Sequence, residues 1–453
     1  MREPRTPRLV RCAALLGAIA GLVACGSGEG EKTEASAPAP APTGKPAPFA
    51  TPQPTVAEPG STGAPPDLPR GIMLALAQFV DQGGKSVPGP ARLEFLYREG
   101  GAWKTAALED PESNVFHKAL VTAGASGPRI LTLGGSAAAV KTWDLEGGSL
   151  RATTLWTKDF GGKFSRMRDA EVADLYGDGS ADLAVATHDQ GVVAVLRPAA
   201  GGTFDVVELD HEPDTFVHEI EVGDLDGDGV PEVYATPSEP NRLDGSPQTG
   251  KVVRYVPKTG EGRVLVADLG QRHAKEILVG DVDGNGRDEL YVSVEGTTGP
   301  DGKQLLESVE IRAYEAGTPA TGGVRIATLP DRLSRFLTAG DVDGDGRKEM
   351  VAAAFSSGVW LLRPGSKLGD EWSVDLIDAD SAGFEHAAIL TDLDGDGTDE
   401  LYVASDKHKE VRRYVWRDGR VIRETIYRRP DPRPIFTWNL MPVPIELIPR
   451  GGS

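Results

Sequence analysis

Five short acidic stretches of this chain share one spacing of oxygen-bearing side chains. Their sequences are DLYGDGSADL from Asp174, DLDGDGVPEV from Asp224, DVDGNGRDEL from Asp281, DVDGDGRKEM from Asp341 and DLDGDGTDEL from Asp392. Oxygens at loop positions 1, 3, 5 and 9, with glycines at positions 4 and 6 that let the backbone curl inward, suit a hard cation such as Ca²⁺. A solvated acidic turn is the alternative for one copy. Five copies in phase favour calcium.

The predicted ligands differ between the copies, and position 7 is expected to contribute its backbone carbonyl. The second, fourth and fifth loops have complete sets: Asp224, Asp226, Asp228, Val230 and Glu232; Asp341, Asp343, Asp345, Arg347 and Glu349; Asp392, Asp394, Asp396, Thr398 and Glu400. The third loop keeps an oxygen at position 5 but loses a charge, with Asp281, Asp283, Asn285, Arg287 and Glu289. The first loop has Tyr176 at position 3, which leaves Asp174, Asp178 and Asp182 and predicts the weakest site. We expect three to five Ca²⁺ ions.

These loops are not EF-hands, and their charge argues for a structural metal. An EF-hand needs a bidentate Glu at position 12 and a helix on each side, whereas β-forming residues follow each loop at once. The formal net charge is −20, and clustered carboxylates repel one another unless cations bind. Calcium is therefore predicted to stabilise the fold and not to catalyse a reaction. Nucleic acid is not expected as a partner of so acidic a chain.

The loops must be positioned by a repeated β-unit. Their first aspartates are 50, 57, 60 and 51 residues apart, a period typical of blades or solenoid turns. Each period contains four short strands, for example RDAEVAD, DLAVATH, GVVAVLRP and FDVVELD around the first loop. Four antiparallel strands per repeat predict an all-β fold, a β-propeller.

Two further blades lack the acidic loop. HKALVTAGASGPRILTLGG begins a sixth unit with Ala123 in place of the first aspartate. A seventh is assembled from GIMLALAQF, ARLEFLYREGG and AWKTAALED, between residues 71 and 110, with PIFTWNLM near residue 436 as its innermost strand. The prolines of MPVPIELIPR argue against that last strand. Seven four-stranded blades are predicted, with six or eight as the alternatives.

The loops and their spacing resemble the FG-GAP and VCBS repeat families, known from the β-propeller of integrin alpha subunits and from bacterial surface proteins. The Phe-Gly and Gly-Ala-Pro signatures of the first family are not evident here, so the VCBS type is the closer description. The resemblance covers roughly residues 115 to 430. It implies calcium loops at one end of the innermost strands. Members include adhesins, receptors and some polysaccharide lyases, and the fold does not choose among them.

The N-terminus predicts export. MREPRTPRLVR is arginine-rich, CAALLGAIAGLVA is apolar, and the segment resembles a lipoprotein signal (residues 1–24) with a lipid on Cys25. An ordinary signal peptide is the alternative. Residues 25–70, rich in Pro and Ala, are expected to form a disordered tether, followed by the propeller at 71–450. We expect a lipid-anchored protein of the periplasm or cell surface, with the outer membrane favoured because Gly26 stands where many lipoproteins have a retaining aspartate.

A ring of cationic residues is predicted at the end of the channel opposite the calcium loops. Six residues before each first aspartate, and at the aligned position of the sixth blade, stand His117, Arg168, His218, Lys275, Arg335 and His386. Such a ring could hold an anionic ligand, although polar residues at a wet rim need no purpose and Asp169, Glu219, Glu276 and Glu385 could pair with them. The leading hypothesis is a non-catalytic module that binds a polysaccharide or protein. A polysaccharide lyase using this ring and a scaffold subunit of an envelope complex are the alternatives.

Overall fold

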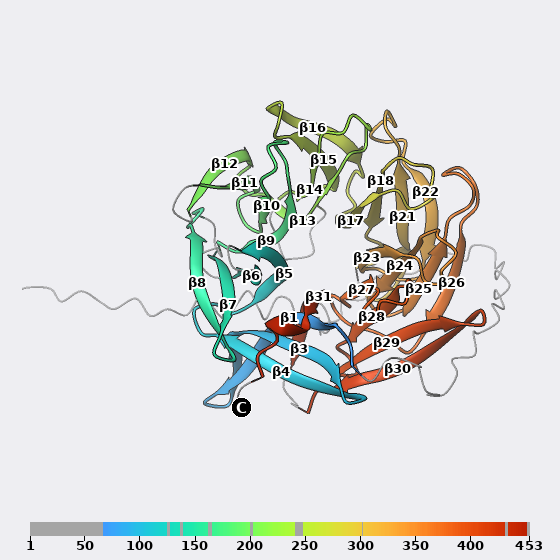
Figure 1. Ribbon diagram of the computed structural model, residues 1–453. Coiled ribbons are helices and arrows are strands. Elements are labelled where there is room, and N and C mark those ends of the chain that lie inside the picture. Colours follow the sequence, from blue (N-terminus) through green and yellow to red (C-terminus); the bar gives the residue numbers. More distant parts are fainter. Residues whose placement is uncertain are drawn as a thin grey trace, which may run out of the picture.

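The computed structural model describes residues 67–450 except 125–126, 136–138, 162–164, 200–202, 241–247, 301 and 431–433. These residues form seven antiparallel blades around a central channel (Figure 1). The prediction of an all-β, seven-bladed propeller is confirmed. The predicted signal peptide, Cys25 and most of the predicted tether lie outside the described residues. Within the described part, no helix has the length and apolar character needed to cross a membrane.

Six blades are built from consecutive segments, and the innermost strand of each comes first in the chain. Blade one contains β5 (Phe116–Gly124), β6 (Gly127–Gly134), β7 (Ala139–Glu146) and β8 (Ser149–Thr157). Blade two contains β9 (Met167–Ala173), β10 (Asp182–Thr187), β11 (Val192–Pro198) and β12 (Phe204–His211). Blade three contains β13 (Phe216–Gly223), β14 (Glu232–Ser238), β15 (Lys251–Val256) and β16 (Glu261–Asp268).

The next three blades carry the third, fourth and fifth acidic loops. Blade four contains β17 (Ala274–Gly280), β18 (Glu289–Val294), β21 (Val309–Tyr314) and β22 (Val324–Leu329). Blade five contains β23 (Ser334–Gly340), β24 (Glu349–Ala354), β25 (Val359–Arg363) and β26 (Ser373–Asp378). Blade six contains β27 (Ala388–Thr391), β28 (Glu400–Ser405), β29 (Glu410–Arg417) and β30 (Arg420–Arg428).

Blade seven joins the two ends of the described chain. Its innermost strand, β31 (Ile435–Pro444), pairs with β1 (Arg70–Gln82), followed by β3 (Ala91–Glu99) and β4 (Ala102–Asp110). The register places Leu440 opposite Leu74 and Pro442 opposite Ile72. The prolines are compatible with this strand because β31 is an edge strand, which needs ladder hydrogen bonds on one side only. The predicted closure is therefore correct, and the short 3₁₀ turn η3 (Ile445–Leu447) follows it.

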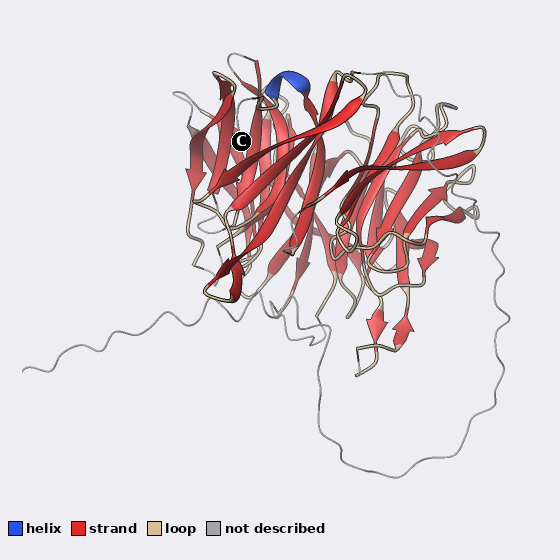
Figure 2. Cartoon of the chain, turned by 90° about the horizontal axis from the view of Figure 1, so that it is seen from below, coloured by secondary structure: helices blue, strands red, loops and turns tan. Residues whose placement is uncertain are grey.

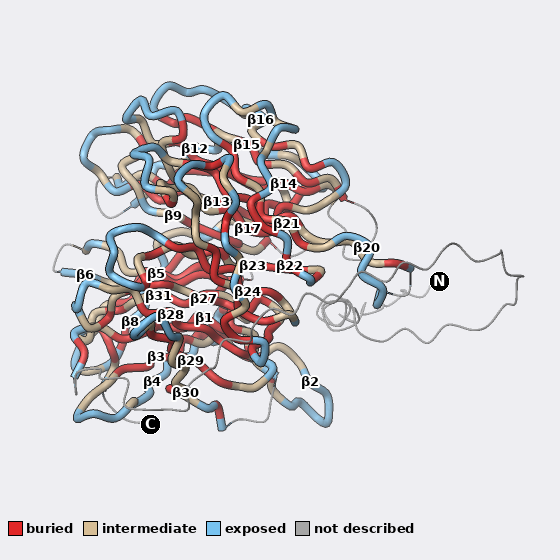
Figure 3. The backbone as a smooth tube through the Cα atoms, turned by 90° about the vertical axis from the view of Figure 1, so that its right-hand side faces the viewer, coloured by how far each residue is buried: buried red, intermediate tan, exposed pale blue. Residues whose placement is uncertain are grey.

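Burial changes from the inside of a blade to its outside. Every residue of β10, β14, β18, β24 and β28, the second strands of the five loop-bearing blades, is buried. The outer strands β12 and β16 are instead largely exposed or half-buried. Figure 3 shows buried residues in the interior of the molecule and exposed residues at the outer turns. The core is therefore a set of apolar layers between neighbouring blades, which hold the ends of the innermost strands in place.

The two ends of the propeller differ. The acidic loops connect first to second strands and lie on one end, which we call the loop face. Connections from second to third strands lie on the other, where two hairpins project: β1 with β2 (Lys85–Pro88), and β19 (Thr297–Thr298) with β20 (Leu305–Glu307). Figures 2 and 3 show the hairpins extending from the same side of the blades. We call this side the hairpin face.

Candidate functional site

The five acidic loops adopt one backbone shape. Glycines at positions 4 and 6 have positive φ in every copy, from 71° at Gly177 and Gly227 to 92° at Gly397. A side chain at such a φ is strained, so the glycines are required by the curl of the loop. The residue at position 2 is buried in each copy and fixes the loop against the core, as Leu175, Leu225, Val282, Val342 and Leu393. Burial of one such side chain stabilises the fold by about 1.5–3 kcal/mol.

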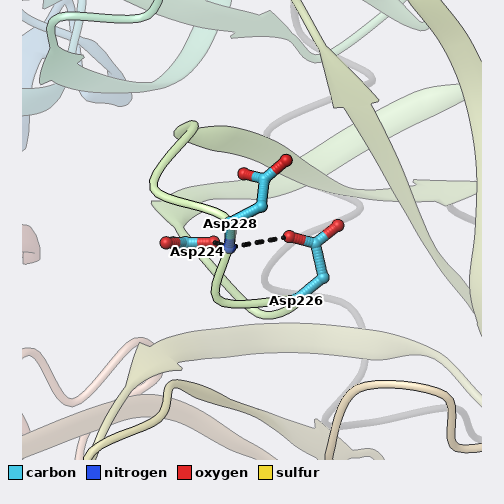
Figure 4. A group of neighbouring side chains, drawn as sticks. All are labelled: Asp224, Asp226 and Asp228. Carbon is cyan, nitrogen blue, oxygen red and sulfur yellow. Dashed lines mark hydrogen bonds between the residues drawn. The ribbon is translucent and has the colours of Figure 1, made fainter.

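Backbone amides orient the acidic side chains. The position 1 carboxylate accepts a hydrogen bond from the N–H of position 6, at 2.8 Å between Gly229 N and Asp224 Oδ2 and at 3.1 Å between Gly397 N and Asp392 Oδ2. Figure 4 shows Asp224, Asp226 and Asp228 of the second loop, with the N–H of Asp228 donating to Asp226. The position 9 carboxylate accepts from the N–H of position 2, as between Leu393 N and Glu400 Oε2 at 3.2 Å.

Four of the loops bring acidic oxygens together. Three carboxylates in each offer one oxygen apiece, all within 4.8 Å of one another: Asp224, Asp226 and Asp228; Asp281, Asp283 and Glu289; Asp341, Asp343 and Glu349; Asp392, Asp394 and Glu400. These clusters could hold metal ions, because carboxylate oxygens are the preferred ligands of hard cations. Three predicted carboxylate ligands of these loops lie outside the clusters: Glu232, Asp345 and Asp396. Asp345 and Asp396 accept hydrogen bonds from the N–H groups of position 7.

Glu232 departs from the pattern of the other position 9 glutamates. It is absent from the second cluster, and Arg254 Nη1 donates to its Oε1 at 2.6 Å. Arg413 contacts the equivalent Glu400 in the fifth loop and lies 3.4 Å from Asp394 Oδ2. These arginines lie on third strands, and nothing in the loop motif predicts them.

The first loop is filled by an arginine. Arg197 Nη2 donates to Asp178 Oδ2 at 2.5 Å and Arg197 Nε lies 3.4 Å from Asp182 Oδ1. Its guanidinium carbon lies 3.8 Å from the ring centroid of Tyr176. A fixed cation therefore pairs with two of the three predicted ligands of this loop, and Asp174 accepts hydrogen bonds from backbone N–H groups.

Burial raises the pKa of the position 9 glutamates. The pKa of Glu289 rises to about 7 because the side chain is buried and Asp283 adds like charge. Burial also raises the pKa of Glu400 to about 7. A tyrosine two residues later donates to this carboxylate, at 3.0 Å from Tyr291 Oη to Glu289 Oε2 and 3.2 Å from Tyr402 Oη to Glu400 Oε2. The sequence carries a hint of this support, because tyrosine occupies position 11 in three of the five copies.

The predicted cationic ring lies on the hairpin face, at the starts of the innermost strands, and most of its members are buried. Arg168 Nη2 is 3.1 Å from His218 Nε2 and 3.8 Å from Glu385 Oε2, and Arg335 Nη1 donates to Glu385 Oε1 at 2.5 Å. Lys275 lies over the ring of Phe216. These four cluster at the channel mouth.

Two predicted members of the ring make other contacts. His117 Nδ1 is 2.6 Å from the carbonyl oxygen of Met167, and its ring packs edge-on against Trp438. His386 is fully buried, with Nε2 2.7 Å from Ser381 Oγ and Nδ1 2.5 Å from the carbonyl oxygen of Ala354. Burial lowers the pKa of His386 to about 4. His386 therefore serves the packing between blades.

A layer of carboxylates lines the channel deeper than this cluster. A cavity of about 280 Å³ is bordered by Lys118, by Arg168 and Arg335 of this cluster, and by six acidic side chains: Asp169, Glu171, Glu219, Glu221, Glu276 and Glu385. Lys118 Nζ is 2.9 Å from Asp169 Oδ1 and also contacts Glu171. Glu385 pairs with the arginines instead. Burial raises the pKa of Glu219, Glu221 and Glu276 well above the usual range of glutamate.

Comparison with known protein families supports the repeats predicted from the sequence. Residues 174–235 and 341–403 match the FG-GAP-like repeat family. The chain contains FG-GAP-like repeats. Each matched stretch begins at the first aspartate of one loop and extends past the end of the next, so the FG-GAP-like pattern covers the first, second, fourth and fifth loops. No curated protein sequence matches the chain.

Several solved structures have a similar arrangement. A protein from Lactobacillus plantarum is 9% identical with a TM-score of 0.50, over 83% of this chain and 99% of that one. A putative 6-phosphogluconolactonase from Bacteroides fragilis is 12% identical with a TM-score of 0.49, over 85% and 100%. The periplasmic gluconolactonase of Pseudomonas aeruginosa is 13% identical with a TM-score of 0.47, over 83% and 99%. At such identities the likeness concerns the fold alone.

Proposed function

We propose that this protein is a non-catalytic binding module whose propeller is stabilised by Ca²⁺ in the second to fifth loops. The observation that carries the metal assignment is the convergence of three acidic oxygens within 4.8 Å in each of these loops. Loops of oxygen ligands with glycine turns favour Ca²⁺ over softer metals. We further propose that a lipid on Cys25 holds the module at the cell envelope, where its ligand is a polysaccharide or a protein.

Bound calcium would act across blade boundaries, because neighbouring loops are joined by hydrogen bonds. Asp341 N donates to Asp399 Oδ2 at 2.9 Å, and Asp399 N donates to the carbonyl oxygen of Asp341 at 2.7 Å, which joins the fourth loop to the fifth. Asp224 N donates to Asp288 Oδ2 at 3.0 Å and joins the second loop to the third. An ion that orders one loop therefore also orders the edge of the next blade.

The stabilising role follows from the thermodynamic linkage between ion binding and folding. An ion that binds only the native protein stabilises it by an amount that grows with the ion concentration relative to Kd. The carboxylates of one cluster repel one another without a cation, and burial makes the charged glutamates costlier. A divalent ion offsets both effects at once.

A combined binding and product assay tests the non-catalytic role. The protein is incubated in Ca²⁺ with a panel of neutral and acidic polysaccharides, bound polysaccharide is measured by co-sedimentation, and lyase products are measured by ultraviolet absorbance of the unsaturated uronate. Binding without product is the expected result. Accumulation of unsaturated product would contradict a non-catalytic module and favour a lyase.

A further inference from the structure

Lys275 is a buried cation that makes no ion pair within the described residues. It is 8% exposed and is the second residue of β17, the innermost strand of blade four. Its Nζ lies 4.8 Å from the ring centroid of Phe216, on the innermost strand of blade three. Within the described residues, no carboxylate oxygen lies within 4.0 Å of Nζ, and the ammonium has no hydrogen-bond acceptor. Burial of an ammonium without acceptors is costly unless a ligand or water completes its shell.

The carboxylates beside Lys275 contact the neighbouring arginines. Arg168 and Arg335 share one carboxylate, that of Glu385, with distances of 3.8 and 2.5 Å. Glu295 Oε1 is 3.9 Å from Arg335 Nη2 and accepts no hydrogen bond. Neither Glu385 nor Glu295 lies within 4.0 Å of Lys275 Nζ, so the positive charge of Lys275 remains unpaired within the described residues.

The nearby histidines do not add to that charge at neutral pH. Burial, together with the charge of Arg168, holds the pKa of His218 well below its usual range. Burial and the charge of Lys275 lower the pKa of His273 to about 2. His218 accepts from Arg168, which agrees with a neutral ring. These imidazoles instead supply polar edges around Phe216, whose centroid lies 5.9 Å from that of His218 and 6.0 Å from that of His273.

We propose that Lys275, Arg335 and Arg168 form an anion site at the channel mouth on the hairpin face, and that its ligand presents a single carboxylate. One carboxylate would balance the unpaired positive charge and give the ammonium its missing acceptor. A doubly charged phosphate would bring a second negative charge beside Glu385 and Glu295. The inference deepens the proposed binding role and rests on it.

An apolar groove beside this site could hold the rest of the ligand. The guanidinium of Arg335 lies 4.3 Å from the ring centroid of Phe384. Phe384 lines a cavity of about 400 Å³ together with Phe355 and Phe436, and the three rings meet edge to face. This volume suits a small ligand. The site therefore favours a carboxylate attached to a group with an apolar face, such as a uronate ring or the C-terminal residue of a peptide.

Calorimetric titration of the full-length protein in Ca²⁺ tests the site. The probes are trigalacturonate, a tripeptide with a free carboxylate and a C-terminal phenylalanine, maltotriose as the neutral sugar, and inorganic phosphate. We expect at least one carboxylate probe to bind, and maltotriose and phosphate to bind more weakly. Preference for trigalacturonate would assign the source as a sugar acid, and preference for the tripeptide would assign it as a peptide end. Tighter binding of phosphate, or no binding of either carboxylate probe, would overturn the proposal.

Variants of Lys275 distinguish a loss of ligand binding from a loss of folding stability. Lys275→Met keeps the volume and removes the charge, so carboxylate binding should weaken at least tenfold while the melting temperature stays level or rises. Lys275→Arg should retain most of the binding. Lys258→Met, which removes an exposed lysine beside the first loop, is the matched control and should bind as the unaltered protein does. Equal binding by Lys275→Met would overturn the anion site, whereas the calcium content, measured on the same samples, reports separately on the proposed function.

Discussion

Arg197 stacks on Tyr176, with 3.8 Å between its guanidinium carbon and the ring centroid, in the one acidic loop that has an aromatic residue at position 3. The same guanidinium pairs with Asp178 and Asp182, two of the carboxylates that the other loops use to form a cluster. In this loop an arginine thus supplies positive charge to two of the three predicted acidic ligands. The contact between Arg197 and Tyr176 therefore accounts for how this acidic loop offsets the charge of its carboxylates without a metal ion.

The first prediction gives the first loop the aspartate that the other four loops have at position 3. Tyr176→Asp combined with Arg197→Ala restores an oxygen at position 3 and removes the competing cation, so the protein should bind one more Ca²⁺ per chain. Elemental analysis after dialysis against calcium measures the number. An unchanged count would show that the first loop lacks another ligand.

A second prediction compares two loops. Asp394→Asn in the fifth loop should remove one Ca²⁺ and lower the melting temperature in calcium, because the cluster loses a charged ligand. Asp178→Asn in the first loop is the matched control and should leave the calcium count unchanged. With chelator present, the deficit of Asp394→Asn should shrink to the loss of its contact with Arg413, since the ion it disturbs is then absent. An undiminished deficit in chelator would contradict a metal-dependent role.

Backbone strain gives a third prediction. Gly397 has φ of 92° and no atom within 4 Å of the position that a Cβ would take, so Gly397→Ala would be costly through φ alone. A positive φ costs an L-residue about 1–2 kcal/mol, and urea unfolding should show a loss of this size. Gly280→Ala is the control, because Gly280 is equally open but has no positive φ. Equal losses in both variants would contradict the strain argument.

The fourth prediction concerns pH. Burial, followed by the charge of Glu171, raises the pKa of Glu221 in the folded protein well above its value of 4.5 in the unfolded chain. The folded state therefore favours the protonated form, and its advantage is full below pH 4.5 and is lost as pH rises through the folded pKa. Glu221→Gln should consequently raise the melting temperature more at pH 8 than at pH 5. A gain that is the same at both pH values would contradict the assignment.

The fifth prediction concerns the closure of the ring. Ending the chain before Ile435 removes β31 and leaves the inner edge of β1 unpaired. Exposed edge strands recruit other strands, so the shortened protein should melt at lower temperature and self-associate, which sedimentation velocity detects. A stable monomer would show that the β31–β1 pairing contributes little to the fold.

The sequence predicts the propeller well because blade and loop are local patterns. Each acidic loop and its flanking strands lie within one stretch of chain, and even the closure of β1 by β31 follows from counting strands. The prolines of β31 argue against a strand when only the local sequence is considered. In the structure β31 lies at the edge of its sheet, where Pro442 and Pro444 are tolerated.

The contacts that tune the sites are not local, and the sequence predicts them less well. Arg197 reaches the first loop from the third strand of its blade, and Asp399 reaches Asp341 from the next blade. The prediction of the cationic ring rests on a fixed offset along the chain, which cannot distinguish a side chain at the channel mouth, such as Lys275, from one turned into the core, such as His386. Side-chain direction depends on bulges and on neighbouring blades.

Thermal unfolding in Ca²⁺ and in chelator, with bound metal counted by elemental analysis of the same samples, tests the central claim most directly. The account predicts four calcium ions per chain and a melting temperature that falls strongly when calcium is removed. No bound calcium, together with the same melting temperature in both conditions, would contradict it and leave the loops as acidic turns of a metal-free propeller.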